Sequence, residues 1–557
     1  MTDGVELVAD QYLPGPAHGR GPWPTLLMRQ PYGRDIASTV VYAHPVWWAS
    51  RGYHVVIQDV RGRGDSGGDF YAFRNEGRDG AETIGWVRGL AASNGKVGMY
   101  GFSYQGATQL LAAAEQPEGL MCIAPHMAAV DLYHGWMYHQ GALRLGSALG
   151  WGIQMLREDA RRRGLRAASD RLEAAWARMR EQPLTVPYGS HAAIADPELP
   201  GYVRDWMSHR MPDGDGQRFW SELDVSTRLD RIQVPALHVA GWYDLYLAGS
   251  VAGYLALRAG AGSEFARENQ YLLAGPWVHI PWGDRVGDRD LGAAANLDTD
   301  GLLLKWFDHW LKDGKSWDEP RVKHFALGEN RWHEAQEWPA AGKVSLYLHS
   351  AGRANSRKGD GRLAAGKPAG EEPRDEFVYD PEVPVMGPGG VDGLNGPRDQ
   401  AAMELGNNLL VYRTAELGGR VHVFGTPRVR LWAATSAGSA DFTAKLVRGM
   451  AGGRVEFVSI GIARSSWLFR EGYEADRVQC WEFELEPTSL VLGEEEWIGL
   501  EVASSAFPLY DRNPSTGVSA ELADNWNWAR STQQVAHTAE WPSALLLPVL
   551  EGGEWLK

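Results

Sequence analysis

The sequence predicts an α/β unit interrupted by a helical insertion and followed by an all-β unit, either a sandwich or a jelly roll. Short apolar runs alternate with helical patterns up to about residue 130, and the strand pattern then disappears until about residue 230. From about residue 321, many short strand-like runs follow with few helical patterns. We therefore expect the α/β unit to comprise residues 1–130 and 230–320, the helical insertion 131–229, and the all-β unit 321–557.

The first part contains short apolar segments that are typical of buried parallel strands. Such strands are continuous apolar runs because helices cover both faces of their sheet. Between them, Asp79–Leu90 has helical spacing, with Ile84 and Val87 on one face. The predicted strands are Thr25–Met28, Val55–Gln58 and Val97–Tyr100.

The insertion is predicted to be helical because Trp151–Glu181 carries apolar residues at helical spacing among many Arg and Glu residues. Beyond it, the strand pattern returns at Pro235–Gly241 and at Tyr271–Ala274. These two runs indicate that the first sheet resumes after the insertion, and we expect it to end near residue 320.

The last part is rich in short runs that alternate in polarity or contain β-branched residues, with turn residues between them. Many strands and few helices are typical of a sandwich or a jelly roll. Gly352–Glu372, rich in Gly, Lys, Arg and Ala, is expected to be a long loop. The predicted strands are Val344–Leu348, Phe377–Tyr379, Leu409–Tyr412, Val421–Phe424, Val429–Trp432, Phe442–Leu446, Val455–Ile460, Val478–Leu485 and Ile498–Val502.

Composition and charge argue against several classes of protein. The 557-residue chain has 44% hydrophobic and 22% charged residues, as ordinary globular proteins do, and a formal net charge of −15. Such an acidic chain repels phosphate backbones and anionic lipids, so we expect neither a nucleic-acid partner nor a membrane partner. The sequence has no run with the apolar density of a membrane span and no signal-peptide pattern, which predicts a cytoplasmic protein.

The most informative segment is Val97–Ala114, where an apolar strand leads directly into an Ala- and Leu-rich helix. The turn between them contains Gly101, Ser103 and Gly106 in the pattern Gly-x-Ser-x-x-Gly. A serine on such a turn is exposed at the carboxyl edge of a sheet, where the helix N-terminus points N–H groups at developing negative charge. We predict that Ser103 is a nucleophile. Because the second glycine comes one residue later than in Gly-x-Ser-x-Gly, an ordinary glycine-flanked turn is the competing interpretation.

A nucleophilic serine requires a base, and the base requires an acid that orients it. In this kind of fold they follow the serine in the order Asp and then His, at the ends of later strands. Asp244 follows the predicted strand Pro235–Gly241, and His279 follows Tyr271–Ala274. The order predicts Asp244 as the acid and His279 as the base. A helix-capping carboxylate and a packed loop histidine would give the same pattern.

The oxyanion of an acyl-transfer intermediate requires two hydrogen-bond donors. The backbone N–H of Tyr104, the residue after the serine, is one expected donor. The other should come from the loop after an early strand, which contains the segment Arg29–Arg34. From the pattern alone, Tyr32 in this loop either aims its phenol into the site or packs beside the turn.

Several motifs occur together in this chain: Gly-Phe-Ser-Tyr-Gln-Gly, Arg-Gln-Pro-Tyr, Gly-Trp-Tyr-Asp and Gly-Pro-Trp-Val-His. Further matching segments are Val55–Gly62, Asp65–Gly68, Ala124–Met127, Asp441–Val447 and Ser504–Asn513. Over nearly its whole length the chain thereby resembles the cocaine esterase family, which is grouped with X-prolyl dipeptidyl-peptidases and α-amino acid ester hydrolases. The resemblance implies an α/β-hydrolase with an inserted helical cap and a C-terminal all-β jelly-roll domain.

The resemblance also implies roles for individual residues. It implies a serine hydrolase whose nucleophile, acid, base and two oxyanion donors are Ser103, Asp244, His279, Tyr32 and the N–H of Tyr104. Near the acyl group of the substrate it places three aromatic residues, Trp136 and Trp151 in the cap and Tyr246 just after Asp244. Because the chain has 25 Trp residues, plain packing in the cap is an equal alternative for these aromatic side chains.

Two segments depart from the related enzymes. The α-amino acid ester hydrolases carry acidic residues just after the triad Asp, where they hold the substrate ammonium, whereas Leu245-Tyr246-Leu247 contains no carboxylate. This difference argues against a free α-amino group on the substrate. Val385–Asp399 is shorter than the cocaine-esterase loop that contributes apolar pocket residues, so the acyl specificity stays open.

The predicted function is a serine carboxylesterase that hydrolyses small, apolar or aromatic esters through an acyl-enzyme. One alternative is an acylase or X-prolyl-type aminopeptidase that cleaves an amide, and another is a carbohydrate-binding protein with an inactive hydrolase half. No cofactor or metal is expected, because the sequence has only two cysteines and no His-x-x-x-His or His-Glu-x-x-His motif at a suitable place. The expected partner is a small-molecule ester, and a homo-oligomer is compatible with the sequence but not required by it.

Overall fold

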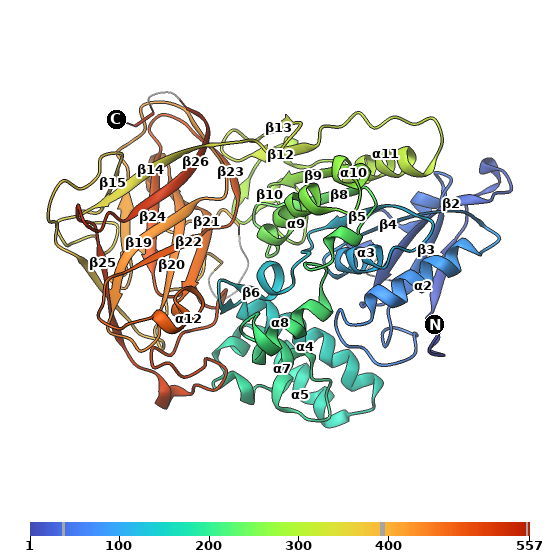
Figure 1. Cartoon of the computed structure of the whole chain (residues 1–557), viewed down its shortest axis with the longest axis horizontal. Helices are drawn as coiled ribbons and strands as arrows, with labels where there is room; N and C mark the ends of the chain where they lie inside the picture. Colours follow the sequence, from blue (N-terminus) through green and yellow to red (C-terminus); the bar gives the residue numbers. More distant parts are fainter. Residues whose placement is uncertain (36–38, 390–395, 553–554, 557) are drawn as a thin grey trace.

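Two large sheets dominate the computed structural model, which describes residues 1–35, 39–389, 396–552 and 555–556. Within the described residues, one sheet has nine strands and the other has thirteen. Figure 1 shows the thirteen-stranded sheet beside the nine-stranded one, with the helices of residues 145–223 below their junction. The active-site candidates all belong to the nine-stranded side and its helical insertion.

The nine-stranded sheet is built from β1 (Ala9–Tyr12), β2 (Trp23–Gln30), β3 (His54–Asp59), β4 (Ser93–Phe102), β5 (Leu120–His126), β8 (Ala236–Gly241), β9 (Gln270–Gly275), β12 (Val322–Ala326) and β13 (Arg331–Ala335). The strand order is β1-β3-β2-β4-β5-β8-β9-β12-β13. From β3 to β12 neighbouring strands are parallel, and β1 and β13 add antiparallel edges. The carboxyl ends of the parallel strands therefore share one edge, where ligands bind in open α/β sheets.

Helices cover both faces of this sheet, because successive residues of a strand point to opposite faces. Leu27 and Val56 belong to a core that includes α2 and α3, whereas Leu26 and Val55 pack with α1 and α11. All four side chains are fully buried, and burying one contributes about 1.5–3 kcal/mol. These helices are α1 (Pro45–Ala49), α2 (Glu76–Arg88), α3 (Tyr104–Ala114) and α11 (Thr299–Leu311), and the sheet is also flanked by α9 (Leu247–Gly260) and α10 (Glu264–Glu268).

The first sheet extends beyond residue 320, where the sequence pattern had placed its end. β12 pairs in parallel with β9, and β13 turns back antiparallel to β12. These strands gave no clear signal because Lys323 and His324 interrupt the apolar run of β12, and β13 is a partly exposed edge strand. The sheet therefore ends at Ala335, inside the segment that we had assigned to the all-β unit.

The segment between β5 and β8 is mainly helical, with α4 (Leu145–Arg162), α5 (Arg166–Ala177), α6 (Ala192–Ala195), α7 (Tyr202–Ser208) and α8 (Gly214–Leu223). The pattern that we had read over Trp151–Glu181 is split between two main helices at Gly164, whose φ of +68° favours glycine. A buried ion pair between Arg63 and Asp159, at 3.0 Å, joins this segment to the loop after β3. The segment also contains two short strands, β6 (Tyr138–His139) and β7 (Ala142–Leu143).

The thirteen-stranded sheet is almost entirely antiparallel. Its described pairings are antiparallel except for β15 with β17. The predicted strands coincide with strands of the structure, whereas β15, β23, β25 and β26 were not predicted. The strands are β14 (Gly342–His349), β15 (Arg362–Ala364), β16 (Asp375–Tyr379), β17 (Leu410–Arg413), β18 (Val421–Gly425), β19 (Arg428–Thr435), β20 (Asp441–Gly449), β21 (Val455–Arg464), β22 (Gln479–Glu484), β23 (Thr488–Leu492), β24 (Trp497–Ala503), β25 (Ser531–Ala536) and β26 (Ala544–Gly552), with α12 (Ser465–Leu468) after β21.

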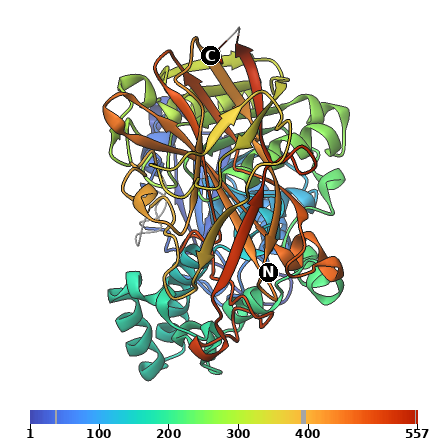
Figure 2. The same ribbon diagram turned by 90° about the vertical axis from the view of Figure 1, so that its left-hand side faces the viewer.

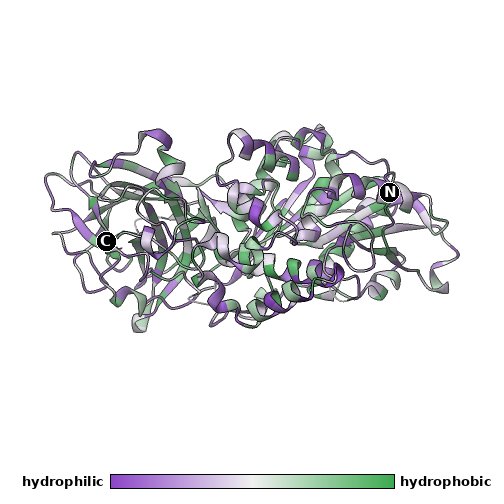
Figure 3. Ribbon diagram, turned by 90° about the horizontal axis from the view of Figure 1, so that it is seen from below, coloured by the Kyte–Doolittle hydropathy of each residue, from purple (hydrophilic) through white to green (hydrophobic). Residues whose placement is uncertain are grey.

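A shared apolar core joins the two sheets. Val251 and Tyr254 of α9 and Phe325 of β12 belong to the same buried cluster as Leu446 and Leu500 of the second sheet. Figure 2 shows the strands of the second sheet in front of the first part, and Figure 3 shows hydrophobic segments inside both halves. Across the described residues, no helix combines the length and apolar character that crossing a bilayer requires.

Candidate active site

Ser103 lies in the sharp turn between β4 and α3, with backbone angles of φ 61° and ψ −128°. A positive φ is unfavourable for a side chain other than glycine, and such strain is typical of functional sites. The flanking glycines are required by close packing. A Cβ on Gly101 would lie 2.4 Å from the Cβ of Gln105, and one on Gly106 would lie 2.7 Å from the Cβ of Ala128.

The unusual spacing of the second glycine has a local explanation. Gln105 occupies the position of the glycine in Gly-x-Ser-x-Gly, and its side chain is buried. Its Oε1 accepts a hydrogen bond of 3.3 Å from the N–H of Phe102, so the side chain is directed back to the turn. The turn therefore accepts a glutamine there, and glycine is needed only one residue later, where α3 contacts the backbone of His126 and the side chain of Ala128.

Asp244 and His279 are brought together because they follow the neighbouring parallel strands β8 and β9. Nδ1 of His279 lies 2.7 Å from Oδ1 of Asp244. The Asp244 side chain is fully buried, whereas that of His279 keeps 22% of its surface exposed. Phe102, next to Ser103, contacts the His279 ring at a centroid distance of 5.4 Å. The turn after β4 and the His–Asp pair thus lie at the same edge of the sheet.

Tyr32 follows β2, and its hydroxyl lies between two other candidate residues. Nε1 of Trp151 donates a hydrogen bond of 3.2 Å to this oxygen, and Ser103 is also within hydrogen-bonding reach of it. Burial raises the pKa of Tyr32 to about 12, although the hydrogen bonds to Trp151 and Ser103 act in the opposite direction. The phenol is therefore protonated at neutral pH, and its O–H group is a hydrogen-bond donor.

Tyr104 begins α3, and no side chain caps this helix end in the described structure. Its side chain points away from that end, since its hydroxyl donates to Oε1 of Glu76 at 2.9 Å and accepts from the N–H of Phe73 at 2.8 Å. The Tyr104 side chain therefore anchors the residue away from the helix end, and an oxyanion donor from Tyr104 would have to be its backbone N–H at the start of α3.

The three predicted aromatic residues form one cluster with the candidate catalytic groups. Trp136 stacks on Tyr246 at 4.0 Å, and the Tyr246 ring meets His279 edge-on at 5.2 Å. Trp151, besides its bond to Tyr32, lies 6.1 Å from the Trp136 ring. Trp136 and Tyr246 are almost fully buried, with exposed fractions of 2% and 6%.

Sequence reasoning missed two aromatic residues of this cluster. Trp206 of α7 stacks on Trp151 at 5.1 Å, with the rings nearly parallel, and Phe73 packs against Trp136 and Tyr104. Neither residue belongs to a motif, and one Trp among 25 carries little information about position. A 320 Å³ cavity opens beside Tyr32, between the loop after β2 and Met155 of α4, one turn along from Trp151.

Within the part of the chain that the structure describes, no group of three or more His, Cys, Asp and Glu residues is arranged to hold a metal ion. A serine at a helix start, a histidine oriented by a buried carboxylate and a protonated phenol are together able to attack a carbonyl carbon and to stabilise the resulting oxyanion.

Two family profiles match most of the chain. The profile described as X-Pro dipeptidyl-peptidase (S15 family) matches residues 3–281. The profile described as X-Pro dipeptidyl-peptidase C-terminal non-catalytic domain matches residues 315–545. Residues 282–314, which include α11, lie between the two matches, and β12 and β13 of the first sheet fall within the second match.

Individual relatives cover the whole chain. The cocaine esterase of Rhodococcus sp. (strain MB1 Bresler) is 32% identical over 99% of this chain and 97% of the relative. The crystal structure of an aminopeptidase from a marine sediment Thaumarchaeota archaeon is 26% identical, with a TM-score of 0.80 over 99% of this chain and 95% of that one. A solved α-amino acid ester hydrolase is 25% identical, with a TM-score of 0.79 and the same coverage.

Proposed function

Because the chain belongs to the X-Pro dipeptidyl-peptidase (S15) family, we propose that it is a serine carboxylesterase acting on small, apolar or aromatic esters. The observation that carries this proposal is the 2.7 Å contact between His279 and the buried Asp244, at the sheet edge where Ser103 directly precedes α3. The full-length similarity to a cocaine esterase supports ester hydrolysis in particular.

In the proposed mechanism, the Oγ of Ser103 attacks the ester carbonyl carbon while Nε2 of His279 takes the hydroxyl proton. Asp244 fixes the ring orientation through Nδ1 and stabilises the imidazolium that forms. The imidazolium then gives its proton to the leaving alcohol, and the acyl group stays on Ser103. A water molecule, activated by the same histidine, hydrolyses this acyl-enzyme and regenerates the serine.

The oxyanion of each tetrahedral intermediate is stabilised by the phenol of Tyr32 and by the backbone N–H of Tyr104. Tyr32 suits this role because its pKa of about 12 keeps the hydroxyl protonated at the pH values at which esterases work. The bond that its oxygen accepts from Trp151 fixes the direction of the phenol and polarises its O–H group.

We assign the acyl group to the vicinity of the aromatic cluster of Trp136, Trp151 and Tyr246. Aromatic side chains of this kind favour flat or apolar acyl groups, which they contact through large rigid surfaces. The absence of a carboxylate in Leu245-Tyr246-Leu247 argues against a substrate that carries a free ammonium group. The loop 385–399, which bears on acyl specificity, falls partly outside the described residues.

The proposal extends to the architecture. We assign the nine-stranded sheet and its helices to an α/β-hydrolase core, the helices α4 to α8 to a cap inserted in it, and the thirteen-stranded sheet to a C-terminal jelly roll. The chain order of Ser103, Asp244 and His279 at the ends of parallel strands supports the first assignment. The match of residues 315–545 to a non-catalytic domain supports the last.

Cleavage of an amide is the second candidate function. The likeness to a solved aminopeptidase over 99% of this chain favours it, and the same Ser, His and Asp would perform it. The two functions differ in the leaving group, since an amine must be protonated before it departs. An X-Pro p-nitroanilide and a p-nitrophenyl ester with the same acyl group therefore separate them.

The test is hydrolysis of p-nitrophenyl acetate by the wild type and by Ser103→Ala, measured side by side with an X-Pro p-nitroanilide and a glycan-binding assay. We expect ester turnover that is lost in Ser103→Ala, with little or no anilide cleavage. Equal activity of the two proteins would overturn the role of Ser103. An inert wild type that binds glycans would instead favour a carbohydrate-binding protein.

A further inference from the structure

The helix that follows Asp244 begins without a cap from its own sequence. α9 starts at Leu247, and Tyr246 before it makes no side-chain capping bond. The first N–H groups of a helix have no partner inside the helix and carry its positive dipole end. One of them, the N–H of Ala248, donates instead to Oε2 of Glu486 at 3.0 Å.

Glu486 comes from the other sheet, in the connection between β22 and β23. Its backbone is held on both sides by β21, because its N–H donates to the carbonyl of Ile460 and its carbonyl accepts from the Ser459 hydroxyl. Its carboxylate is therefore a fixed group of the second sheet that reaches across to the first. The exposed fraction of Glu486 is 8%, so water competes weakly for these bonds.

The same carboxylate binds a buried arginine. Nη2 of Arg144 donates to Oε1 of Glu486 at 2.6 Å, and Arg144 is itself 2% exposed. Arg144 directly precedes α4, the helix that carries Trp151. Nearby His139 lies 3.7 Å from Glu486, but burial and the charge of Arg144 lower its pKa far below the usual value, so it is neutral. Glu486 thus joins the starts of α9 and α4, one through each oxygen.

Both helix starts lead directly to the candidate active site. Tyr246, which precedes α9, stacks on Trp136 and meets the ring of His279 at 5.2 Å. Asp244 lies two residues earlier, and the N–H of Leu247 donates to its carbonyl. A shift of the first turn of α9 therefore changes the positions of the acid and of the aromatic ring beside the base.

We propose that Glu486 is a positioning residue for catalysis: through Ala248 and Arg144, the C-terminal sheet holds Asp244, Tyr246 and His279 in their reactive arrangement. This inference rests on the proposed serine hydrolase function and goes beyond it, since it gives the C-terminal domain a part in turnover without contact with the substrate. Displacement of a catalytic group by about 1 Å costs on the order of 10²-fold in rate.

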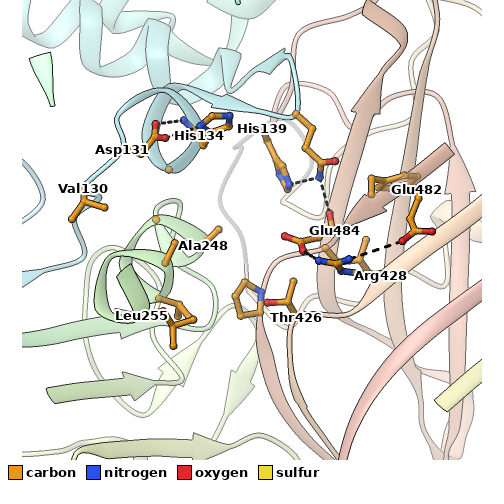
Figure 4. A pocket seen from close by; sticks show the side chains of 18 residues that line it. Val130, Asp131, His134, His139, Ala248, Leu255, Thr426, Arg428, Glu482 and Glu484 are labelled. Carbon is orange, nitrogen blue, oxygen red and sulfur yellow. Dashed lines mark hydrogen bonds and ion pairs between the residues drawn. The ribbon is translucent and has the colours of Figure 1, made fainter. Parts of the chain in front are cut away.

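A second glutamate close to Glu486 in the sequence, on the solvent-exposed side of the contact between Glu486 and α9, provides a matched control. A groove of 780 Å³ runs between Ala248 on α9 and Glu484 on β22, and Figure 4 shows both side chains on its walls. Leu485 and Pro487 line the groove, whereas the Glu486 carboxylate between them contacts Ala248 and Arg144. Glu484 pairs with Arg428 at the half-exposed surface, so Glu484→Gln changes the same charge without touching α9.

The experiment compares wild type, Glu486→Ala, Glu486→Gln and Glu484→Gln in p-nitrophenyl acetate hydrolysis. The concentration of reactive sites is titrated with a fluorophosphonate, so that unfolded protein does not count. We expect kcat per titrated site to fall about 10- to 100-fold in Glu486→Ala, with KM changed less than kcat. Glu486→Gln should show a smaller loss, because its amide oxygen keeps one of the two bonds, and Glu484→Gln should match the wild type.

A kcat per titrated site within threefold of wild type in Glu486→Ala would overturn the inference, even if the melting temperature fell, because the contact would then only stabilise the fold. If Glu486→Ala does not fold, Glu486→Gln decides by the same threefold criterion. Failure of the proposed function is distinguishable, since it would appear as wild-type activity that persists in Ser103→Ala.

Discussion

The indole N–H of Trp151 donates to the hydroxyl oxygen of Tyr32 at 3.2 Å, and this bond joins helix α4 to the loop after β2. The two residues are 119 positions apart. The phenol therefore has a neighbour from the inserted segment that fixes its oxygen, and the Ser103 side chain is also a hydrogen-bond partner of this phenol. The position of the Tyr32 phenol, which we propose as an oxyanion donor, thus depends on the helical insertion as well as on its own loop.

Replacement of Tyr32 by Phe removes one proposed oxyanion donor and leaves the ring in place. Loss of one donor from such a hole costs about 10²–10³-fold in kcat, and we expect a loss of that size in Tyr32→Phe. Steady-state kinetics with p-nitrophenyl acetate measure it, and the melting temperature checks the fold. A kcat within fivefold of wild type would show that Tyr32 only packs beside the turn.

Trp151→Phe should have a smaller effect, because it removes only the bond that orients the phenol. The Phe ring still stacks on Trp206, whereas the N–H is lost. One hydrogen bond contributes about 0.5–1.5 kcal/mol, so we expect kcat to fall roughly two- to tenfold. Trp151→Phe added to Tyr32→Phe should cause little further loss, and additive losses would contradict the coupling of the two residues.

Asp244→Asn keeps the shape of the side chain but removes its charge. His279 would then lack the partner that selects its tautomer and stabilises its protonated form. In a serine protease triad the equivalent change lowers kcat by about 10⁴-fold, and we expect a comparable loss here. Turnover per folded molecule, with circular dichroism as the control, measures it. A loss of less than tenfold would mean that another carboxylate orients His279.

Buried neutral histidines make the fold sensitive to mild acid. Burial lowers the pKa of His238 to about 4, against 6.5 for a free histidine. Between these two pKa values the histidine is protonated in the unfolded chain and neutral in the folded chain. The contribution of the neutral histidine to the free energy of unfolding is therefore complete above pH 6.5 and is lost as the pH falls toward 4. Other buried histidines with the same sign, and a pKa of about 3 or 4, are His54, His126, His191 and His324.

The free energy of unfolding should fall by about 1.4 kcal/mol per pH unit for each such histidine between pH 6 and pH 4.5. Nε2 of His238 lies 3.1 Å from the amide oxygen of Gln270, and the side-chain amide of a glutamine is able to replace this contact. In urea unfolding, His238→Gln should show a slope shallower by about this amount. An unchanged slope would place the titration elsewhere.

The triad candidates were predictable because each follows an apolar strand, and strand order alone determines which carboxyl ends meet. Ser103 was also predictable from its own segment, because glycines flank it in the sequence. The structure explains these glycines, since a side chain at Gly101 or Gly106 would clash with its neighbours. The role of Tyr32 could not be predicted from its own segment, since the sequence of a loop does not determine the direction of a phenol side chain. Its partner Trp151 belongs to a helix whose place over the loop depends on tertiary packing.

Three other features of the structure could not be predicted from the sequence around them. The edge strand β13 is half-exposed and mixed in polarity, so the end of the first sheet was placed too early. The break at Gly164 was overlooked because its flanks continue a helical pattern. Glu486 lies on a loop between two strands of the other sheet, where a glutamate is ordinary, and only the structure shows its contacts with Ala248 and Arg144.

If Ser103, activated by His279, forms the acyl-enzyme, a reagent that reacts covalently with activated serines should modify Ser103. Wild type, Ser103→Ala and His279→Ala are treated with a fluorophosphonate, and the modified peptide is identified by mass spectrometry. We expect a single adduct on Ser103 in the wild type, none in Ser103→Ala and a much slower reaction in His279→Ala. An adduct on another residue, or equal labelling of Ser103→Ala, would contradict it.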